Sequence, residues 1–275
     1  MKRFIASATL FAIMCIFSTG CNNSSENTGS NIENGYSDGE KKLLNDTFSN
    51  TRVCYGQGYE TDEKNRPIGA TDAQSHYGKL GAMFIGNEKM KTIYLTFDEG
   101  YENGYTENIL DTLKEKNVKA TFYVTLDYVK SCPDIVKRMI EEGHSVGNHT
   151  CSHPSLPDCS DEEFMRELKD LEVYIENNFS GYKTTTVRPP KGEFSERTLA
   201  LAKSMGYDTV LWSFAYSDWN PDSQPDRQKA YNRITEATHN GAVYLLHAVS
   251  KTNAEILGDV IDYWQDNGYE IKAVK

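Results

Sequence analysis

From residue 91 onward, the chain alternates short β-rich segments with amphipathic helical segments, and this alternation restricts the possible fold more than any other feature. Seven β-rich segments are separated by six helical ones, several of which end at a glycine that suits a helix C-terminus. Repeated strand–helix units favour parallel strands with helices outside, so we expect an α/β barrel, complete or distorted, with an open sheet as the alternative. The expected strands are residues 92–97, 119–125, 144–150, 184–190, 207–214, 242–249 and 269–274.

The chain before this pattern divides into stretches of different composition. Residues 1–20 join a basic start to a short apolar run and small residues, which predicts an export signal, and Cys21 is the expected site of lipid attachment. Residues 21–44 are polar and rich in Gly, Ser and Asn, which predicts a flexible tether. We expect residues 45–88 to form an N-terminal arm packed on the domain of residues 89–275, outside the cytoplasm and anchored to the membrane through Cys21.

Composition and charge narrow the expected partners. The formal net charge of −11 argues against nucleic acid, because phosphate contacts need a basic face. The 17 tyrosines fit a neutral or sparsely charged ligand better, such as a sugar, and we expect a monomer. Outside the cell, the four cysteines after Cys21 could form up to two disulfides in three possible pairings. These cysteines are Cys54, Cys132, Cys151 and Cys159.

Polar residues follow several expected strands, where both a barrel and an open sheet place their ligand site. The motif HTCSH sets His149 and His153 four residues apart, which would bring both imidazoles to one side of a helical turn. Two imidazoles and one carboxylate make the ligand set of an open catalytic zinc site. The alternative is a chance pair of surface histidines, and Cys151 between them should point away from their shared face.

Two adjacent acids, Asp98 and Glu99, end the first expected strand. Adjacent side chains in a regular strand point to opposite faces, but a chain that curls before Gly100 could turn both acids toward the mouth of the barrel. One acid would then bind a cation that offsets their mutual repulsion, while the other would remain free as a base. The alternative is two solvated acids in a turn.

His247 and Arg188 also end expected strands, and each has a candidate acidic partner at another strand end. A hydrogen bond from the His247 ring to Asp218 would raise the pKa of the imidazole into the range useful to a general acid. Arg188 could pair with Asp98 and hold that carboxylate ionised. The alternatives are a core histidine and a structural ion pair at the barrel rim.

The motifs TFDEG, HTCSH, RPPKG, SDW and LLH occur in the order of the five motifs of NodB-type polysaccharide deacetylases, carbohydrate esterase family 4. The chain resembles this family over residues 89–275, and the resemblance implies a distorted (β/α)7 barrel and metal-dependent removal of acetyl groups from a glycan, with Zn²⁺ as the expected ion. The stretches GYENGY, YLLHAVS and NAEIL resemble one branch, the delta-lactam-biosynthetic de-N-acetylases. That branch acts on N-acetylmuramic acid in the peptidoglycan of spore-forming bacteria.

The resemblance also implies roles for individual residues. The catalytic residues would be Asp98, His247, Arg188 and Asp218. The metal would be held by Glu99, His149 and His153. The substrate would be bound by Leu245, Trp219, Lys191 and Tyr101. Asp98 would be the base and His247 the acid, while the backbone N–H at Lys191 would belong to the oxyanion hole. Family members usually carry Asp in place of Glu99 and Tyr in place of Lys191.

Two other functions are open to a chain with these motifs. One is a deacetylase of N-acetylglucosamine glycans or chitin, which would yield glucosamine rather than muramic acid or its lactam. The other is a lipid-anchored wall-binding protein that keeps the barrel without turnover. Glu99 is the one feature that favours the binding protein, and the presence of Asp98 and His247 argues against it.

Overall fold

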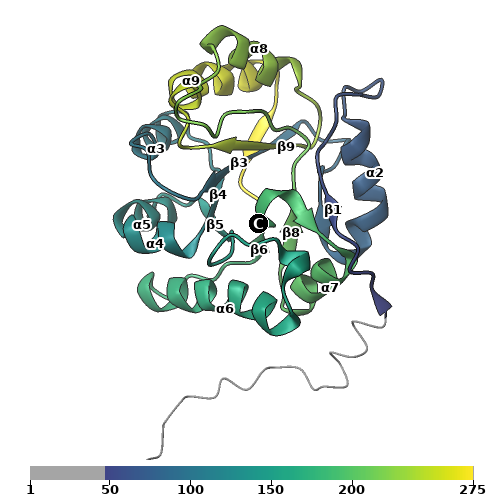
Figure 1. Ribbon diagram of the computed structural model, residues 1–275. Coiled ribbons are helices and arrows are strands. Elements are labelled where there is room, and N and C mark those ends of the chain that lie inside the picture. The colour runs from purple at the N-terminus through teal and green to yellow at the C-terminus, as the bar shows by residue number, and fades with distance from the viewer. Residues whose placement is uncertain (1–46, 275) are drawn as a thin grey trace, which may run out of the picture. The chain divides into compact units, whose positions relative to one another are not determined.

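The computed structural model describes residues 47–274, which form an α/β unit around a curled sheet of parallel strands (Figure 1). The sheet runs in the order β10 (Glu270–Lys272), β3 (Thr92–Glu99), β4 (Thr121–Val124), β5 (Ser145–Asn148), β6 (Thr186–Val187), β8 (Asp208–Val210) and β2 (Ala82–Met83). β9 (Ala242–His247) pairs with β3 on the side opposite to β4, since Thr96 is paired with both Thr121 and Leu245. All the strands expected from the sequence are present.

The ring of strands closes through an irregular segment rather than a regular strand pair. After β8, the backbone N–H groups of Ser213 and Phe214 donate to the carbonyl of Val243 in β9 at 2.9 and 3.1 Å. The N–H of Leu245 donates in turn to the carbonyl of Phe214 at 2.8 Å. The predicted distorted barrel is therefore confirmed, and its distortion lies between β8 and β9.

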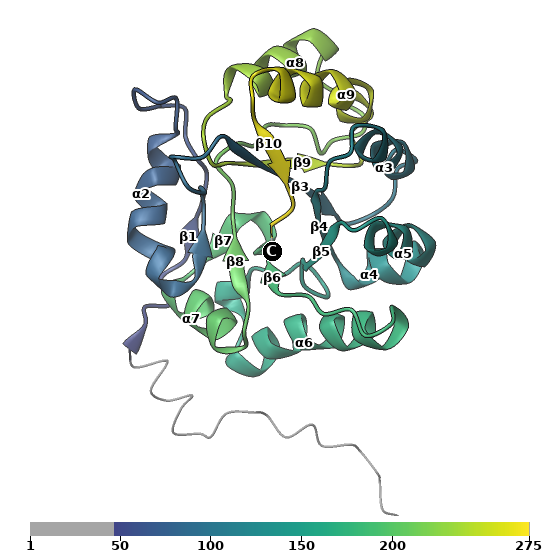
Figure 2. The ribbon, with the colours of Figure 1, turned by 180° about the vertical axis from the view of Figure 1, so that it is seen from behind.

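Helices cover the outside of the sheet, as Figures 1 and 2 show from opposite sides. The α-helices are α2 (Ile68–Tyr77), α3 (Thr106–Glu115), α4 (Leu126–Ser131), α5 (Pro133–Glu141), α6 (Asp161–Asn178), α7 (Glu196–Ser204), α8 (Arg227–Glu236) and α9 (Lys251–Asp266). The short 3-10 helices are η1 (Gly78–Leu80), η2 (Leu156–Asp158) and η3 (Pro190–Gly192). α6 begins with a capping box, in which Ser160 and Glu163 each accept a hydrogen bond from the other's backbone N–H.

Several short elements carry no periodic signal in the sequence. β1 (Val53–Cys54) and β7 (Glu193–Phe194) form a two-stranded antiparallel pair, and α4 is a separate helix before α5. The stretch 45–88, expected as an arm, contributes β2 to the main sheet through parallel pairing with β8. Two-residue strands are too short for an alternation of apolar and polar residues to be recognised.

The structure also bears on the cysteines and on the predicted anchor. All four cysteines among residues 47–274 are free thiols. In the same range, no helix has both the length and the apolar character that a membrane crossing requires. The predicted export signal, the tether and Cys21 lie outside the described residues.

β3 is buried on both of its faces and carries the first candidate site residues. Leu95 and Phe97 are 0% exposed and belong to the core that the strands share with the covering helices. Thr96 and Asp98, which alternate with them, both contact the side chain of Arg188. The strand therefore turns its even-numbered residues toward the barrel interior and its odd-numbered residues toward the helices.

Replacement of Trp264 in α9 by alanine should lower the free energy of unfolding by about 3–5 kcal/mol, measured by urea denaturation. The side chain is 0% exposed, its ring centroid lies 4.7 Å from that of Tyr244 in β9, and its indole N–H donates to the hydroxyl of Thr238 at 3.0 Å. Val173→Ala, at a partly exposed site on α6, is the control and should cost less than about 1 kcal/mol. A similarly small cost for Trp264→Ala would contradict this packing.

Candidate active site

A cavity of about 830 Å³ opens at the carboxyl ends of the parallel strands. Its wall includes most of the residues singled out from the sequence, namely Asp98, Tyr101, His149, His153, Lys191, Trp219, Leu245 and His247. Arg188 and Asp218 lie behind this wall, since each is fully buried and bonded to a residue in it. Strand ends that are far apart in the sequence therefore meet at one site.

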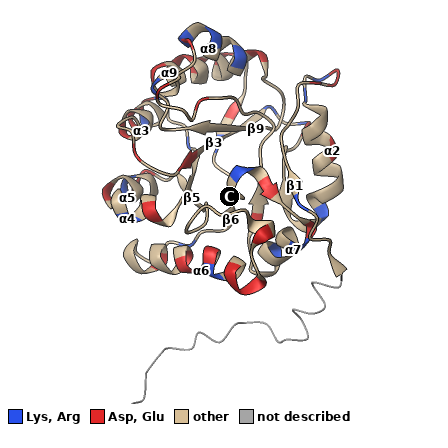
Figure 3. Cartoon of the chain, in the orientation of Figure 1, with Lys and Arg blue, Asp and Glu red and all other residues tan. Residues whose placement is uncertain are grey.

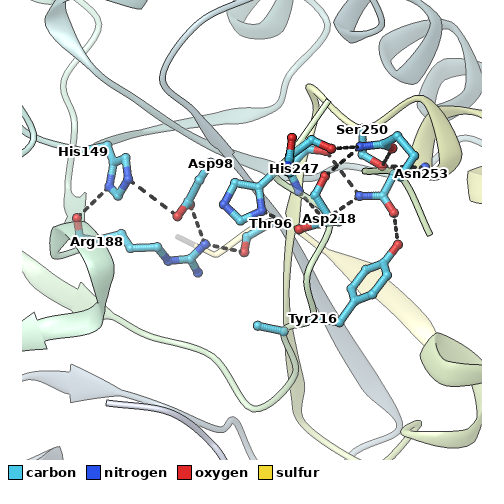
Figure 4. Close-up of polar contacts among 12 residues, drawn as sticks. Thr96, Asp98, His149, Arg188, Tyr216, Asp218, His247, Ser250 and Asn253 are labelled. Atoms are coloured by element: carbon cyan, nitrogen blue, oxygen red, sulfur yellow. Dashed lines mark hydrogen bonds and ion pairs between the residues drawn. The ribbon is translucent and has the colours of Figure 1, made fainter. Parts of the chain in front are cut away.

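Asp98 is held by Arg188, a guanidinium that is entirely buried (Figure 4). Nη1 of Arg188 donates to Asp98 Oδ1 at 2.8 Å and to the hydroxyl of Thr96 at 2.7 Å. Nε and Nη2 donate to the carbonyls of Val210 and Leu211, both at 3.0 Å, which fixes the guanidinium plane. Burial alone would raise the pKa of Asp98, but the charge of Arg188, aided by nearby histidines, outweighs burial and lowers it. Asp98 is therefore an ionised carboxylate at neutral pH.

The imidazoles of His149 and His153 face Asp98 as neutral rings. His149 Nδ1 donates to the carbonyl of Arg188 at 2.8 Å, which leaves the lone pair on Nε2, 3.6 Å from Asp98 Oδ2. The ring centroids of the two histidines are 5.0 Å apart. Burial lowers the pKa of His149 to about 4 and also lowers that of His153. Both rings therefore keep a lone pair available at neutral pH.

The motif HTCSH does not form the helical turn expected from its spacing. β5 ends at Asn148, and the following loop has left-handed backbone at Thr150 (φ 69°) and His153 (φ 60°). The side chain of Asn148 accepts from Thr150 N–H at 2.8 Å, and the hydroxyl of Thr150 accepts from His153 N–H at 3.0 Å. These bonds replace helical ones, and the loop still brings His149 and His153 together.

Glu99 is not brought to the two histidines, because β3 remains regular through Glu99 and pairs there with Val124 of β4. The chain therefore does not curl before Gly100, and Glu99 shares the helix-facing side of the strand with Phe97. Its side chain is 0% exposed, and neither carboxyl oxygen has a hydrogen-bond partner. Burial, with the nearby charges of Glu102 and Asp98, raises the pKa of Glu99 well above its usual value, so this carboxyl is neutral.

The two histidines suit a metal ion, but the third expected ligand, Glu99, does not. Among residues 47–274, no three His, Cys, Asp or Glu side chains form a group that could hold a metal. His149 and His153 fit a metal individually, because they are neutral and the bond to the Arg188 carbonyl orients one ring. Glu99 does not fit, because its oxygens lie under the helices, and Asp98 is the carboxylate that faces the histidines.

His247 is paired with a fully buried acid, Asp218. His247 Nδ1 donates to Asp218 Oδ1 at 2.7 Å, and the backbone N–H of His247 donates to Oδ2 at 2.9 Å. Burial disfavours the charged ring, but the hydrogen bond and charge of Asp218 outweigh burial and raise the pKa of His247. The ring therefore holds a proton on Nε2, at the cavity wall, to higher pH than an ordinary histidine.

The sequence analysis missed two residues that support this pair. Nδ2 of Asn253 donates to Asp218 Oδ2 at 2.6 Å and to the carbonyl of His247 at 3.2 Å (Figure 4). The hydroxyl of Tyr216 donates to Asn253 Oδ1, which fixes the orientation of the amide. The hydroxyl of Ser250 caps α9 by accepting from Asn253 N–H at 3.2 Å. The sequence signal that could have identified Asn253 is its place three residues after Ser250, a favourable N-cap residue at a helix start.

The remaining candidates lie at the rim and in the wall of the cavity. Tyr101 and Trp219 are 51% and 55% exposed, and the Trp219 ring centroid lies 6.0 Å from that of His247. Leu245 is 5% exposed and belongs to the wall. Lys191 is exposed and has left-handed backbone, with φ 59°. The cavity thus combines aromatic faces at its mouth with charged groups at its floor.

Comparisons with known proteins agree on one family. The model of the polysaccharide deacetylase family matches residues 85–210. The peptidoglycan-N-acetylmuramic acid deacetylase PdaA of Bacillus subtilis is 43% identical over 196 residues, covering 71% of this chain and 74% of PdaA. The peptidoglycan-N-acetylglucosamine deacetylase of Bacillus cereus is 33% identical over 206 residues, covering 75% of this chain and 74% of that protein. The solved structure of Bacillus subtilis PdaA, a family 4 carbohydrate esterase, matches with a TM-score of 0.77 and 40% identity, covering 82% of this chain and 96% of that one.

Asp218→Asn should lower the pKa of His247, because the ring stays buried while the neighbouring negative charge is lost. The protonated ring then disappears at lower pH, so the alkaline limit of any turnover that needs it should also move to lower pH. NMR titration of the His247 ring signals in the wild-type and Asp218→Asn proteins measures the pKa. An unaltered His247 pKa in a folded Asp218→Asn protein would argue against this pairing.

Glu99→Gln should stabilise the metal-free protein at pH 8 but not at pH 4. Because folding raises the pKa of Glu99, the carboxyl ionises more readily in the unfolded chain, and the wild type loses stability as pH rises above the unfolded value. Glutamine does not ionise, so the variant avoids that loss. Urea unfolding at the two pH values tests this, with the exposed Glu115→Gln as control. A variant that is less stable than wild type at pH 8 would show that Glu99 is charged in the fold.

Proposed function

Because this chain belongs to the polysaccharide deacetylase family, we propose that it hydrolyses the acetamido group of N-acetylmuramic acid in peptidoglycan, as a step toward the muramic delta-lactam of spore cortex. The observation that carries the proposal is the presence of two oppositely arranged ion pairs at one cavity. Asp98 is paired with buried Arg188, which favours the ionised carboxylate, and His247 is paired with buried Asp218, which favours the protonated ring. The resemblance to PdaA supports muramic acid as the sugar.

The two groups have complementary tasks in amide hydrolysis. Asp98 takes the proton from the water that attacks the acetyl carbon, and the backbone N–H at Lys191 donates to the oxyanion of the tetrahedral intermediate. As the C–N bond breaks, His247 gives its Nε2 proton to the departing amine. The products are acetate and a free amino sugar. Arg188 and Asp218 act by holding these groups in position and in charge state.

The family's deacetylases are metal-dependent in general, and we assign the ion here to His149 and His153. Zn²⁺ suits neutral imidazole nitrogens, and in this assignment Asp98 stays unbound so that it can act as the base. A bound ion would polarise the acetyl carbonyl and lower the pKa of water. Glu99 has no part in this assignment, because its carboxyl faces the helices.

The cavity rim supports a glycan as the substrate. Tyr101 and Trp219 offer exposed aromatic faces on which sugar rings can stack, and Leu245 gives an apolar wall for the acetyl methyl. Peptidoglycan lies outside the cytoplasm, which agrees with the expected export and with a lipid anchor at Cys21. We propose that the anchored monomer acts on glycan strands at the outer surface of the cell membrane.

A glucosamine-forming deacetylase is the second candidate, supported by the 33% identity to the N-acetylglucosamine deacetylase of Bacillus cereus. Incubation with purified peptidoglycan, followed by analysis of the amino sugars, separates the two functions. Muramic acid or its lactam supports the proposal, and glucosamine supports the alternative. Absence of acetate with every divalent metal tried would instead support a wall-binding protein.

Asp98→Asn should lower acetate release by about 10²–10⁴-fold, because the base is lost while an oxygen remains for the hydrogen bond from Arg188. Acetate is measured by a coupled assay, and circular dichroism verifies the fold. Asp134→Asn, at an exposed acid in the first turn of α5, should leave the rate unchanged. Full activity of Asp98→Asn would remove Asp98 from the role of base.

A further inference from the structure

Lys191 is the only lysine or arginine among the described residues that line the cavity. Its side chain is exposed and forms no ion pair or hydrogen bond with any other residue of the range 47–274. Asp98, by contrast, already has Arg188 as its partner. The ammonium group of Lys191 is therefore the one described cation of the cavity wall that is free to meet an anionic part of a ligand.

Hydrogen bonds and two prolines hold the backbone turn that carries Lys191 in one conformation. Lys191 has φ 59° and Gly192 has φ 68°, both in the left-handed region, which is unfavourable for a lysine. The N–H of Gly192 donates to the carbonyl of Pro189 at 3.2 Å, and the carbonyl of Gly192 accepts from Tyr55 N–H at 3.1 Å. These bonds and two consecutive prolines hold the turn, so the lysine leaves the backbone in a set direction.

The same turn is attached to the reacting groups. It begins at Arg188, whose side chain bonds Asp98 and whose carbonyl accepts from His149 Nδ1 at 2.8 Å. Lys191 follows three residues later and lines the cavity together with His153. The side chain of Lys191 therefore lines the same cavity as Asp98 and His247, the groups proposed to act on the acetamido group.

Muramic acid differs from glucosamine by a lactyl ether on O3, and where no stem peptide is attached, this ether ends in a carboxylate. C3 is bonded to C2, which carries the acetamido group, so the carboxylate must lie next to the reacting amide. The protein has a net charge of −11, and acidic residues recur along α6 (Figure 3), so the overall field repels an anionic glycan. A local cation at the cavity is the group that can offset this repulsion.

We infer that the ammonium group of Lys191 binds the lactyl carboxylate and sets a preference for N-acetylmuramic acid over N-acetylglucosamine. The inference rests on the proposed function and adds to it the residue that distinguishes the two sugars. The backbone N–H of Lys191 keeps its separate task in the oxyanion hole, which any side chain at this position allows. Loss of the charge should therefore change sugar preference more than the rate of hydrolysis itself.

The test compares kcat/KM for two glycans of equal length, one with muramic acid and one with only glucosamine. Lys191→Met should lower the ratio of muramic to glucosamine activity by about fivefold or more, as expected for a charge pair partly shielded by a cavity. Lys191→Arg should retain the ratio, and Lys137→Met, at an exposed lysine of α5 outside the cavity wall, is the matched control. The loss should shrink in 1 M salt, where the Debye length is about 3 Å, and disappear on the methyl ester of the lactyl group.

An unchanged ratio in Lys191→Met, or an equal loss on both glycans, would overturn the inference, because either result assigns Lys191 a structural role. Calorimetric binding of the two sugars in the Asp98→Asn background separates this from failure of the proposed function. If the wild type releases no acetate from either glycan, the function is wrong. The calorimetric affinities then test the inference about Lys191. Equal affinity of the Asp98→Asn protein and the Asp98→Asn, Lys191→Met protein for the muramic sugar overturns the inference, whereas weaker affinity of the second protein supports it.

Discussion

Arg188 lies entirely inside the barrel, where an unpaired guanidinium would cost several kcal/mol of stability. Two backbone carbonyls, a hydroxyl and the carboxylate of Asp98 together accept its hydrogen bonds, so the charge is fully matched. The same residue accepts a hydrogen bond from His149 through its carbonyl. The side chain of Arg188 therefore ties three strands together and sets the charge of the base, while its backbone carbonyl orients the nearest imidazole.

The site separates an acid and a base by giving them opposite environments. The guanidinium beside Asp98 favours the ionised carboxylate, whereas Asp218 beside His247 favours the protonated ring. Asn253 extends the second pair into α9, because its amide holds the oxygen of Asp218 that does not face the ring. Both supporting residues, Arg188 and Asp218, are fully buried.

Much of this arrangement was predictable from sequence because strand ends are readable from periodicity. The pairs of Asp98 with Arg188 and of His247 with Asp218 were expected from their places at strand ends, and the structure contains both pairs. The loop after β5 was not predictable, since its left-handed residues depend on local hydrogen bonds that spacing does not encode. The position of Glu99 away from the two histidines was not predictable for a related reason, because only pairing with β4 shows that the strand stays regular.

Asp98 is held as an ionised base by its buried partner Arg188. A carbon-13 NMR titration of the Asp98 carboxyl in metal-free protein measures its pKa. We expect a pKa below the usual aspartate range, so that the signal of Asp98 remains that of a carboxylate as the pH falls through 4. Uptake of a proton by this carboxyl at or above pH 4 would show that Arg188 does not control the charge of the base.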